Sequence, residues 1–306
     1  MKCRITVFTP TYNRGYIIEN LYSSLKRQSF HDFEWLVIDD GSTDGTQVLF
    51  EQWSNQENNF TIRYYKQKNG GKCRAINHAL QFAEGEIFFT VDSDDYLTDD
   101  ALAKVNRWFE EIAGDKQLVG IVANRGDSSV HTENYCFQER YLDKSLLDIY
   151  SYKRDGKKVF DGERAFAFYT NFHRKYLYPE FINENFMTEA VAWNRMANDG
   201  YKMRFFNDII WVYEYKDDGL TRAGSKLFLN NPRGYGLWLK EKANFEKISL
   251  KERIKMYFTF TCDMSSLYDS KMISECIGGP ILMISLMNLA HRIFYILCRI
   301  SNYRTD

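Results

Sequence analysis

The stretch EIFFTVDSDD, residues 86–95, sets an apolar run directly against three carboxylates. A short segment rich in aromatic and β-branched residues is typical of a buried strand. Polar side chains at the end of such a strand are typical of the ligand-binding edge of an α/β sheet. The segments around this stretch therefore decide whether the chain builds such a sheet.

Three more strand-like segments precede residues 86–91, and each is followed by a polar cluster. The segments are 4–9, 34–39 and 61–66, and the clusters are Pro10–Arg14, Asp39–Thr46 and Asn69–Lys72. Apolar residues at helical spacing predict helices over 16–28, 43–53, 72–84 and 99–113, and a further strand is expected over 118–124. This alternation predicts an α/β fold with a mainly parallel sheet and helices on both faces. The polar clusters should then meet at one edge.

Composition excludes several classes of protein. The chain has 306 residues, 44% of them hydrophobic and 16% aromatic, which is too apolar for a disordered chain. A net charge of −1 argues against a nucleic-acid binder. Six widely spaced cysteines without a C-x-x-C pair indicate a reducing compartment and no zinc site. With no signal-peptide pattern at the N-terminus, we expect a cytoplasmic protein.

The acidic cluster after the strand at 86–91 predicts a metal site. Like charges crowded at a strand end repel one another, and a divalent cation with oxygen ligands relieves that repulsion. The cluster Asp92-Ser93-Asp94-Asp95 could hold such a cation, Mn²⁺ or Mg²⁺. The alternative is an acidic helix start with Asp94 or Asp95 as its N-cap.

The other clusters suit a nucleotide. Asp40 could accept hydrogen bonds from a nucleobase N–H or from ribose hydroxyls, or it could only form a turn. Tyr12 could lie against a base ring. Asn69–Lys72 offers backbone N–H groups and a cation for an anionic ligand.

The motifs PTYNR, VIDDGSTDGT, KNGGKCRAIN and VDSDDYL, in this order, resemble the nucleotide-sugar half of family 2 glycosyltransferases. A later stretch, FMTEAVAWNRMANDGY (186–201), resembles a bacterial subset of that family. The resemblance implies the GT-A fold, whose sheet is Rossmann-like. It also implies roles for site residues. Those expected to hold the nucleoside, usually uridine, are Pro10, Thr11, Tyr12 and Asp40; Lys72 and Arg74 lie near the nucleotide; Asp94 binds the metal; and Asp92 reaches the ribose or a metal-bound water.

Transfer with inversion needs a base that takes the proton from the acceptor hydroxyl. The family places Glu-Asp before an amphipathic helix, whereas this chain has Glu189-Ala190. Glu189 is the predicted base, with Glu184 as the fallback; the alternative is that Glu189 only caps the helix. Trp193 would stack on an acceptor sugar or pack in the core. Residues 217–225 are predicted to form a loop that closes over the donor.

The segment 277–300 is the most apolar of the chain. Its polar residues fall within about 100° on a helical wheel: Ser285, Asn288, Arg292, Tyr295, Arg299 and Asn302. From residue 221 onward, 13 Lys or Arg stand against 7 Asp or Glu. These features predict a helix lying in a membrane interface, and the alternative is a helix packed on the protein's own core.

Together these patterns predict a GT-A domain over 1–220 and a helical, basic and apolar extension over 221–306. The nucleotide-sugar half is 1–125 and the acceptor half is 126–220. The expected activity is inverting, metal-dependent transfer of a sugar from a UDP-sugar to a glycan or lipid-linked oligosaccharide in cell-surface polysaccharide synthesis. We expect a peripheral protein at the inner face of the membrane, which binds no nucleic acid and could form oligomers. The alternatives are a non-catalytic glycosyltransferase-like subunit and, behind it, a nucleotidyltransferase.

Overall fold

The computed structural model describes residues 2–147, 153–154, 157–159, 163–213, 224–246 and 248–302, with the side chains of the last helix described as far as Ile293. Contacts divide the chain into two compact units. Unit 1 comprises residues 1–178 and 192–217, and unit 2 comprises 179–191 and 218–306. Segment 179–191 therefore groups with the C-terminal helices. The domain boundary expected at residue 220 stays a prediction.

Unit 1 contains a nine-stranded sheet in the order β3-β2-β1-β4-β10-β6-β11-β5, with β7 also pairing with β11. The first four strands in this order are parallel: β1 (Cys3–Thr11), β2 (Phe33–Asp39), β3 (Thr61–Lys66) and β4 (Gly85–Thr90). The remaining strands are β5 (Tyr96–Leu97), β6 (Leu118–Gly126), β7 (Leu142–Lys144), β10 (Arg164–Tyr169) and β11 (Lys202–Val212). The strands β8 (Lys153–Arg154) and β9 (Lys157–Lys158) pair only with each other. The expected α/β fold is confirmed.

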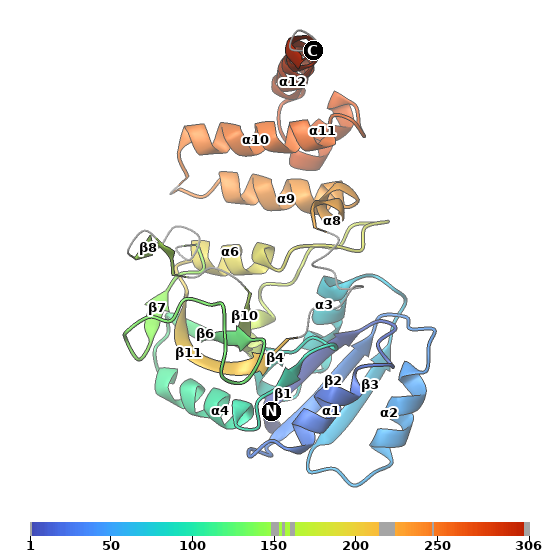
Figure 1. Ribbon diagram of the computed structural model, residues 1–306, viewed down its shortest axis with the longest axis vertical. Coiled ribbons are helices and arrows are strands. Elements are labelled where there is room, and N and C mark those ends of the chain that lie inside the picture. Colours follow the sequence, from blue (N-terminus) through green and yellow to red (C-terminus); the bar gives the residue numbers. More distant parts are fainter. Residues whose placement is uncertain are drawn as a thin grey trace. The chain divides into compact units, whose positions relative to one another are not determined.

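Helices cover both faces of this sheet (Figure 1). They are α1 (Glu19–Lys26), α2 (Thr46–Ser54), α3 (Lys72–Phe82), α4 (Ala101–Ile112), α5 (Thr170–His173) and α6 (Ala190–Asn198). Alternate residues of each strand point to opposite faces, so β1 buries Val7 on one side and Phe8 on the other. Trp35 and Trp108, both fully buried, belong to the core that includes residues of α1, α2 and α4. Packing of the helices on the sheet fixes the positions of the strand ends.

Two features of the sheet differ from expectation. Strand β10 enters antiparallel between β4 and β6, with Ala167 opposite both Phe89 and Ile121. The stretches 203–206 and 209–213 each have a strand-like sequence, yet Lys202–Val212 form one long strand, β11, whose register with β6 shifts between Phe205 and Ile209. That irregularity interrupts the alternation of side chains, which explains why the pattern suggested two strands.

Unit 2 is helical, as expected for the region after residue 218. Its helices are α8 (Ser225–Leu229), α9 (Pro232–Ala243), α10 (Leu250–Met264), α11 (Ser270–Ile277) and α12 (Ile281–Asn302). Figure 1 shows α10 lying along α9. The apolar segment starting at residue 277 is broken between α11 and α12, because Gly278 adopts the left-handed conformation at φ 64° and Pro280 follows. Among the described residues, none of the helices combines the length and the apolarity needed to cross a bilayer.

Candidate active site

The loops after β1 and β2 are locked together. The backbone N–H of Asn13 donates to Ser42 Oγ over 2.8 Å, and Thr43 N–H donates to Asn13 Oδ1, also over 2.8 Å. Asn13 adopts a positive φ of 52°, a conformation that asparagine tolerates better than most residues. Within this frame Thr11 is buried and Tyr12 is about half exposed, at 49%. The Tyr12 ring is thus available to a ligand at the carboxyl edge of the sheet.

Asp40 organises the loop that follows β3. Its Oδ1 accepts hydrogen bonds from Gln67 Nε2 and Gly70 N–H at 2.7 and 2.9 Å, and its Oδ2 accepts one from Gly71 N–H at 2.7 Å. Gly71 has a φ of 91°, which favours glycine there. A carboxylate has about four acceptor positions, so Asp40 keeps room for one more donor. Its expected contact with a nucleobase would use that position.

Two charge pairs join the acidic loop after β4 to its neighbours. Lys72 Nζ, at the start of α3, lies 2.7 Å from Asp92 Oδ1, and Arg14 Nη2 lies 3.6 Å from Asp94 Oδ2. Burial alone would raise the pKa of Asp92, but the Lys72 and Arg125 charges outweigh it and lower that pKa. The pKa of Asp94 is raised, by burial first and by the Asp92 charge second. Asp94 therefore carries negative charge that its surroundings compensate poorly.

The third carboxylate, Asp95, connects this loop to β6 and β11. Its Oδ2 accepts hydrogen bonds from Trp211 Nε1 and Arg125 Nη2, each at 2.7 Å. Arg125 lies over the Trp211 ring at 4.5 Å and over the Tyr213 ring at 5.4 Å, and pairs with Glu163 at 2.7 Å. Burial, followed by repulsion from Asp92 and Asp94, raises the pKa of Asp95 to about 7 against the opposing effect of Arg125.

Sequence reasoning assigned no role to Arg125 or Trp211. The signal available was the third aspartate of DSDD, whose carboxylate needs a partner once it is buried. Nothing in the sequence indicates which groups provide it, because Arg125 and Trp211 lie 30 and 116 residues further along the chain.

The described side chains of the acidic loop could supply only some of the ligands of a divalent cation. No group of three or more His, Cys, Asp or Glu side chains placed to hold a metal ion occurs in the described part of the chain. Asp94 and Asp92 offer hard carboxylate oxygens of the kind that Mg²⁺ and Mn²⁺ take, and such ions commonly complete their coordination with phosphate oxygens and water. The charge of ionised Asp94, which Arg14 at 3.6 Å compensates only in part, fits a cation at this position.

Trp193 and Phe166 form a stacked aromatic pair within unit 1. Their ring centroids are 4.3 Å apart and their planes differ by 23°. Trp193, on α6, is half-buried, and Phe166 belongs to β10. The pair is consistent with the alternative that Trp193 packs in the core, and the part of the indole that stays exposed could contact a sugar.

The two candidate bases have different surroundings in unit 2. Glu189 is half-buried and directly precedes α6. Glu184 is buried, and its two carboxylate oxygens accept hydrogen bonds from Arg233 N–H and Gly234 N–H in the first turn of α9, both at 2.9 Å. Negative charge at a helix N-terminus is stabilising, so Glu184 has a structural role. Residues 217–223, which make up most of the predicted closing loop, lie outside the described residues.

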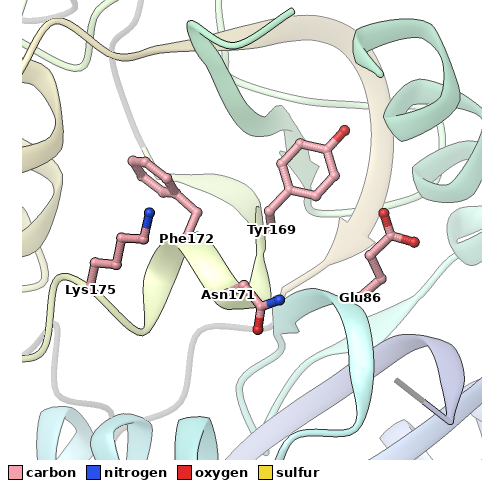
Figure 2. A pocket seen from close by; sticks show the side chains of 5 residues that line it. All are labelled: Glu86, Tyr169, Asn171, Phe172 and Lys175. Carbon is pink, nitrogen blue, oxygen red and sulfur yellow. The ribbon is translucent and has the colours of Figure 1, made fainter. Parts of the chain in front are cut away.

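A pocket of about 340 Å³ lies at the opposite edge of the sheet, near the start of β4. Figure 2 shows the side chains that line it: Glu86, Tyr169, Asn171, Phe172 and Lys175. Glu86 and Asp92 stand at opposite ends of one strand, roughly 20 Å apart at 3.3 Å per residue. This pocket is therefore separate from the acidic loop.

Residues 6–187 match the family model described as Glycosyl transferase family 2, which covers more than half of the chain. The chain belongs to that family and is a glycosyltransferase. Among curated relatives, poly(ribitol-phosphate) beta-N-acetylglucosaminyltransferase TarS of Staphylococcus aureus is 36% identical over 118 residues, 38% of this chain and 20% of TarS. The GalNAc(5)-diNAcBac-PP-undecaprenol beta-1,3-glucosyltransferase of Campylobacter jejuni is 27% identical over 234 residues, 73% of this chain and 69% of the relative. The match thus spans only a fifth of TarS.

Solved structures share the fold. Residues 1–349 of S. aureus TarS in complex with UDP-GlcNAc superpose with a TM-score of 0.58 and 20% identity, covering 94% of this chain and 91% of that one. A Pyrobaculum calidifontis mannosyltransferase in complex with GDP-Man and Mn²⁺ gives a TM-score of 0.56 and 18% identity, over 96% and 86% of the two chains. The expected GT-A fold is confirmed, and the family match supports the glycosyltransferase interpretation over the nucleotidyltransferase alternative.

Proposed function

We propose that the protein is an inverting, metal-dependent glycosyltransferase that moves a sugar from a UDP-sugar to a glycan or lipid-linked oligosaccharide. The observation that carries this proposal is the meeting of Asp92, Asp94, Lys72 and Arg14 at the carboxyl edge of the sheet. Two carboxylates and two cations from three separate loops form a site of mixed charge. Such a site suits a diphosphate together with a divalent cation.

The leaving group of the proposed reaction is UDP, whose negative charge grows as the glycosidic bond breaks. Lys72 and Arg14, which pair with Asp92 and Asp94, would donate hydrogen bonds to phosphate oxygens. Asp94 and Asp92 would hold Mn²⁺ or Mg²⁺, which when bound neutralises charge on the leaving diphosphate. Pro10, Thr11 and Tyr12 would hold the uridine, with Asp40 facing the base and Arg74 beside the nucleotide.

Glu189 is the proposed base. It would accept the proton of the acceptor hydroxyl as that oxygen attacks the anomeric carbon on the face opposite UDP, which gives inversion. The occupied oxygens of Glu184 favour Glu189 over the fallback. Trp193 is the proposed platform for the acceptor sugar.

The acceptor is proposed from the relatives and from the C-terminal region. TarS acts, by its name, on poly(ribitol-phosphate), and the Campylobacter relative acts on an undecaprenol-linked glycan. A lipid-linked acceptor requires the enzyme to work at a membrane, and residues 277–300 are the proposed contact. The role is then synthesis of a cell-surface polysaccharide at the cytoplasmic face.

Calorimetric titration with UDP tests the donor site. We expect UDP to bind in the presence of Mn²⁺ and EDTA to abolish that binding. The UDP affinity of Asp94→Asn should be at least about tenfold weaker, because a metal ligand is removed. Asp99→Asn is the matched control, since Asp99 pairs with Arg27 on the surface. Donor hydrolysis that disappears in Asp94→Asn would set aside the non-catalytic subunit. Equal UDP binding with and without metal would overturn the proposed metal dependence.

A further inference from the structure

Helix α12 turns its most apolar side away from the helices on which it packs. Ile284 is fully buried among residues of α9, α10 and α11. The opposite side carries four apolar side chains that are between 50 and 71% exposed: Leu282, Leu286, Leu289 and Ile293. Their spacing of four, three and four residues places them in one stripe along the helix.

Two polar residues of α12, Asn288 and His291, face inward instead. Asn288 is buried, and its Nδ2 donates to Ser270 Oγ on α11 over 3.2 Å. His291 Nδ1 lies 3.0 Å from Ser265 Oγ, just beyond the end of α10. The predicted polar stripe is thus used partly for packing within unit 2. An uncovered apolar stripe of this length marks an interaction surface.

Helix α10 adds a second apolar stripe, made of Leu250, Ile254 and Phe258, which are 71, 48 and 39% exposed. Gly279, just before α12, approaches Tyr257 so closely that an added Cβ would lie 2.8 Å from its ring. Tyr257 lies roughly 60° around α10 from Ile254, at 100° per residue, so α12 begins on the side of α10 next to this stripe. We call the two stripes together the apolar-basic face.

Charge is segregated around this face. Lys251 and Lys255 are exposed and lie roughly 60–100° from the centre of the α10 stripe, at 100° per residue. Glu252 lies roughly 160° from that centre, where it caps its own helix through Ser249. Arg292, also exposed, flanks the α12 stripe. Cations therefore border the apolar surface.

We propose that the apolar-basic face lies in the surface of a bilayer that contains anionic lipids. Apolar side chains enter the boundary between headgroups and acyl chains, and the flanking lysines pair with lipid phosphates. A second copy of the chain fits less well, because two-fold pairing of this face would bring the lysines of α10 together. The inference deepens the proposed function, on which its biological role depends, and adds α10 to the contact expected from 277–300 alone.

Vesicle sedimentation with the full chain tests the proposal. We expect the protein to co-sediment with vesicles of equal parts phosphatidylglycerol and phosphatidylethanolamine, and much less with phosphatidylcholine vesicles. The double variant Leu286→Glu, Leu289→Glu should bind the anionic vesicles at least about tenfold more weakly, because it places charge in the stripe. Lys251→Gln, Lys255→Gln should reduce binding to anionic vesicles and lessen its dependence on salt.

The matched control is Val130→Glu, the same kind of change at an 88% exposed apolar residue of unit 1, which should leave vesicle binding unchanged. UDP titration of each variant reports the donor site separately, so failure of the lipid proposal and failure of the proposed function give different results. If the folded wild-type protein ignores anionic vesicles, the proposal is wrong. Light scattering that shows a dimer disrupted by Leu286→Glu, without vesicle binding, would assign the face to a second copy instead.

Discussion

The indole N–H of Trp211 donates to Asp95 Oδ2 over 2.7 Å and so joins the end of β11 to the loop that carries Asp92 and Asp94. Both groups are buried, at 3 and 4% exposure. A hydrogen bond to a buried charged group contributes roughly 1.5–3 kcal/mol. This bond therefore positions the acidic loop.

Trp211→Phe should keep an aromatic ring at this position and lose the hydrogen bond to Asp95 Oδ2. We expect metal-dependent UDP affinity to fall about tenfold, because the loop then samples other arrangements. Trp108→Phe is the matched control, since Trp108 stacks on Phe206 in the same core at 4.2 Å. Calorimetry on both variants measures the effect. If Trp211→Phe binds UDP as tightly as the wild type, the hydrogen bond between Asp95 and Trp211 contributes to stability alone.

Lys72 is expected to recognise phosphate. Lys72→Met removes the cation 2.7 Å from Asp92, so UDP affinity should fall at least about tenfold while uridine affinity stays nearly constant. The control is Lys68→Met, at an exposed lysine of the same loop. A parallel loss of UDP and uridine affinity would mean instead that the loop itself is disturbed.

Substitution of Glu189 should affect catalysis, whereas substitution of Glu184 should affect stability. Glu189→Gln is expected to lower kcat by about 100-fold or more at unchanged melting temperature, because the amide cannot accept the proton. Glu184→Gln should cost about 1 kcal/mol of stability, through the weakened cap of α9, and retain turnover. Turnover assays and thermal melts on both proteins check this. The reverse outcome would make Glu184 the base.

His173 makes stability depend on pH. Neither ring nitrogen has a hydrogen-bond partner among the described residues, and the ring lies 4.8 Å from Phe168. Burial lowers the pKa of His173 from 6.5 to about 3. The unfolded chain therefore binds a proton below pH 6.5 that the folded protein rejects. The contribution of His173 to stability is complete above that pH and falls by about 1.4 kcal/mol per unit below it.

Denaturant unfolding at pH 7, 6 and 5 tests this dependence. His173→Phe should unfold with a smaller loss of stability between pH 6 and 5 than the wild type. His31→Asn, at an exposed histidine, should follow the wild type. If His173→Phe and the wild type lose stability in parallel, the buried ring does not exclude the proton.

Much of the nucleotide-sugar half could be predicted from the sequence, because its elements are short and locally patterned. The strand expected over 61–66 has those bounds in the structure, and the helix expected over 72–84 ends two residues earlier. The meeting of Lys72 with Asp92 follows from parallel strands that end at one edge. Motif resemblance supplied the family, which the family model confirms.

The parts that were missed depend on contacts between distant residues. The three hydrogen bonds that Asp40 accepts from Gln67, Gly70 and Gly71 give it a role in the loop after β3 that the sequence did not indicate. The hydrogen bonds that Glu184 accepts from the first turn of α9 come from residues about 50 positions further along the chain. Asn288 faces the other helices of unit 2 and donates to Ser270 on α11. A helical wheel of one segment cannot show such a contact with another helix.

The insertion of β10 has a consequence for how the chain acquires its structure. Strands β4 and β6 are separated by a strand that comes about 40 residues after β6. The sheet therefore stays split until residue 169 has left the ribosome, and such long-range pairing is slow to form. A fragment ending at residue 125 would expose the bare edge of β4 and self-associate. The first 125 residues contain the nucleotide motifs, but the compact unit to which they belong extends to residue 217.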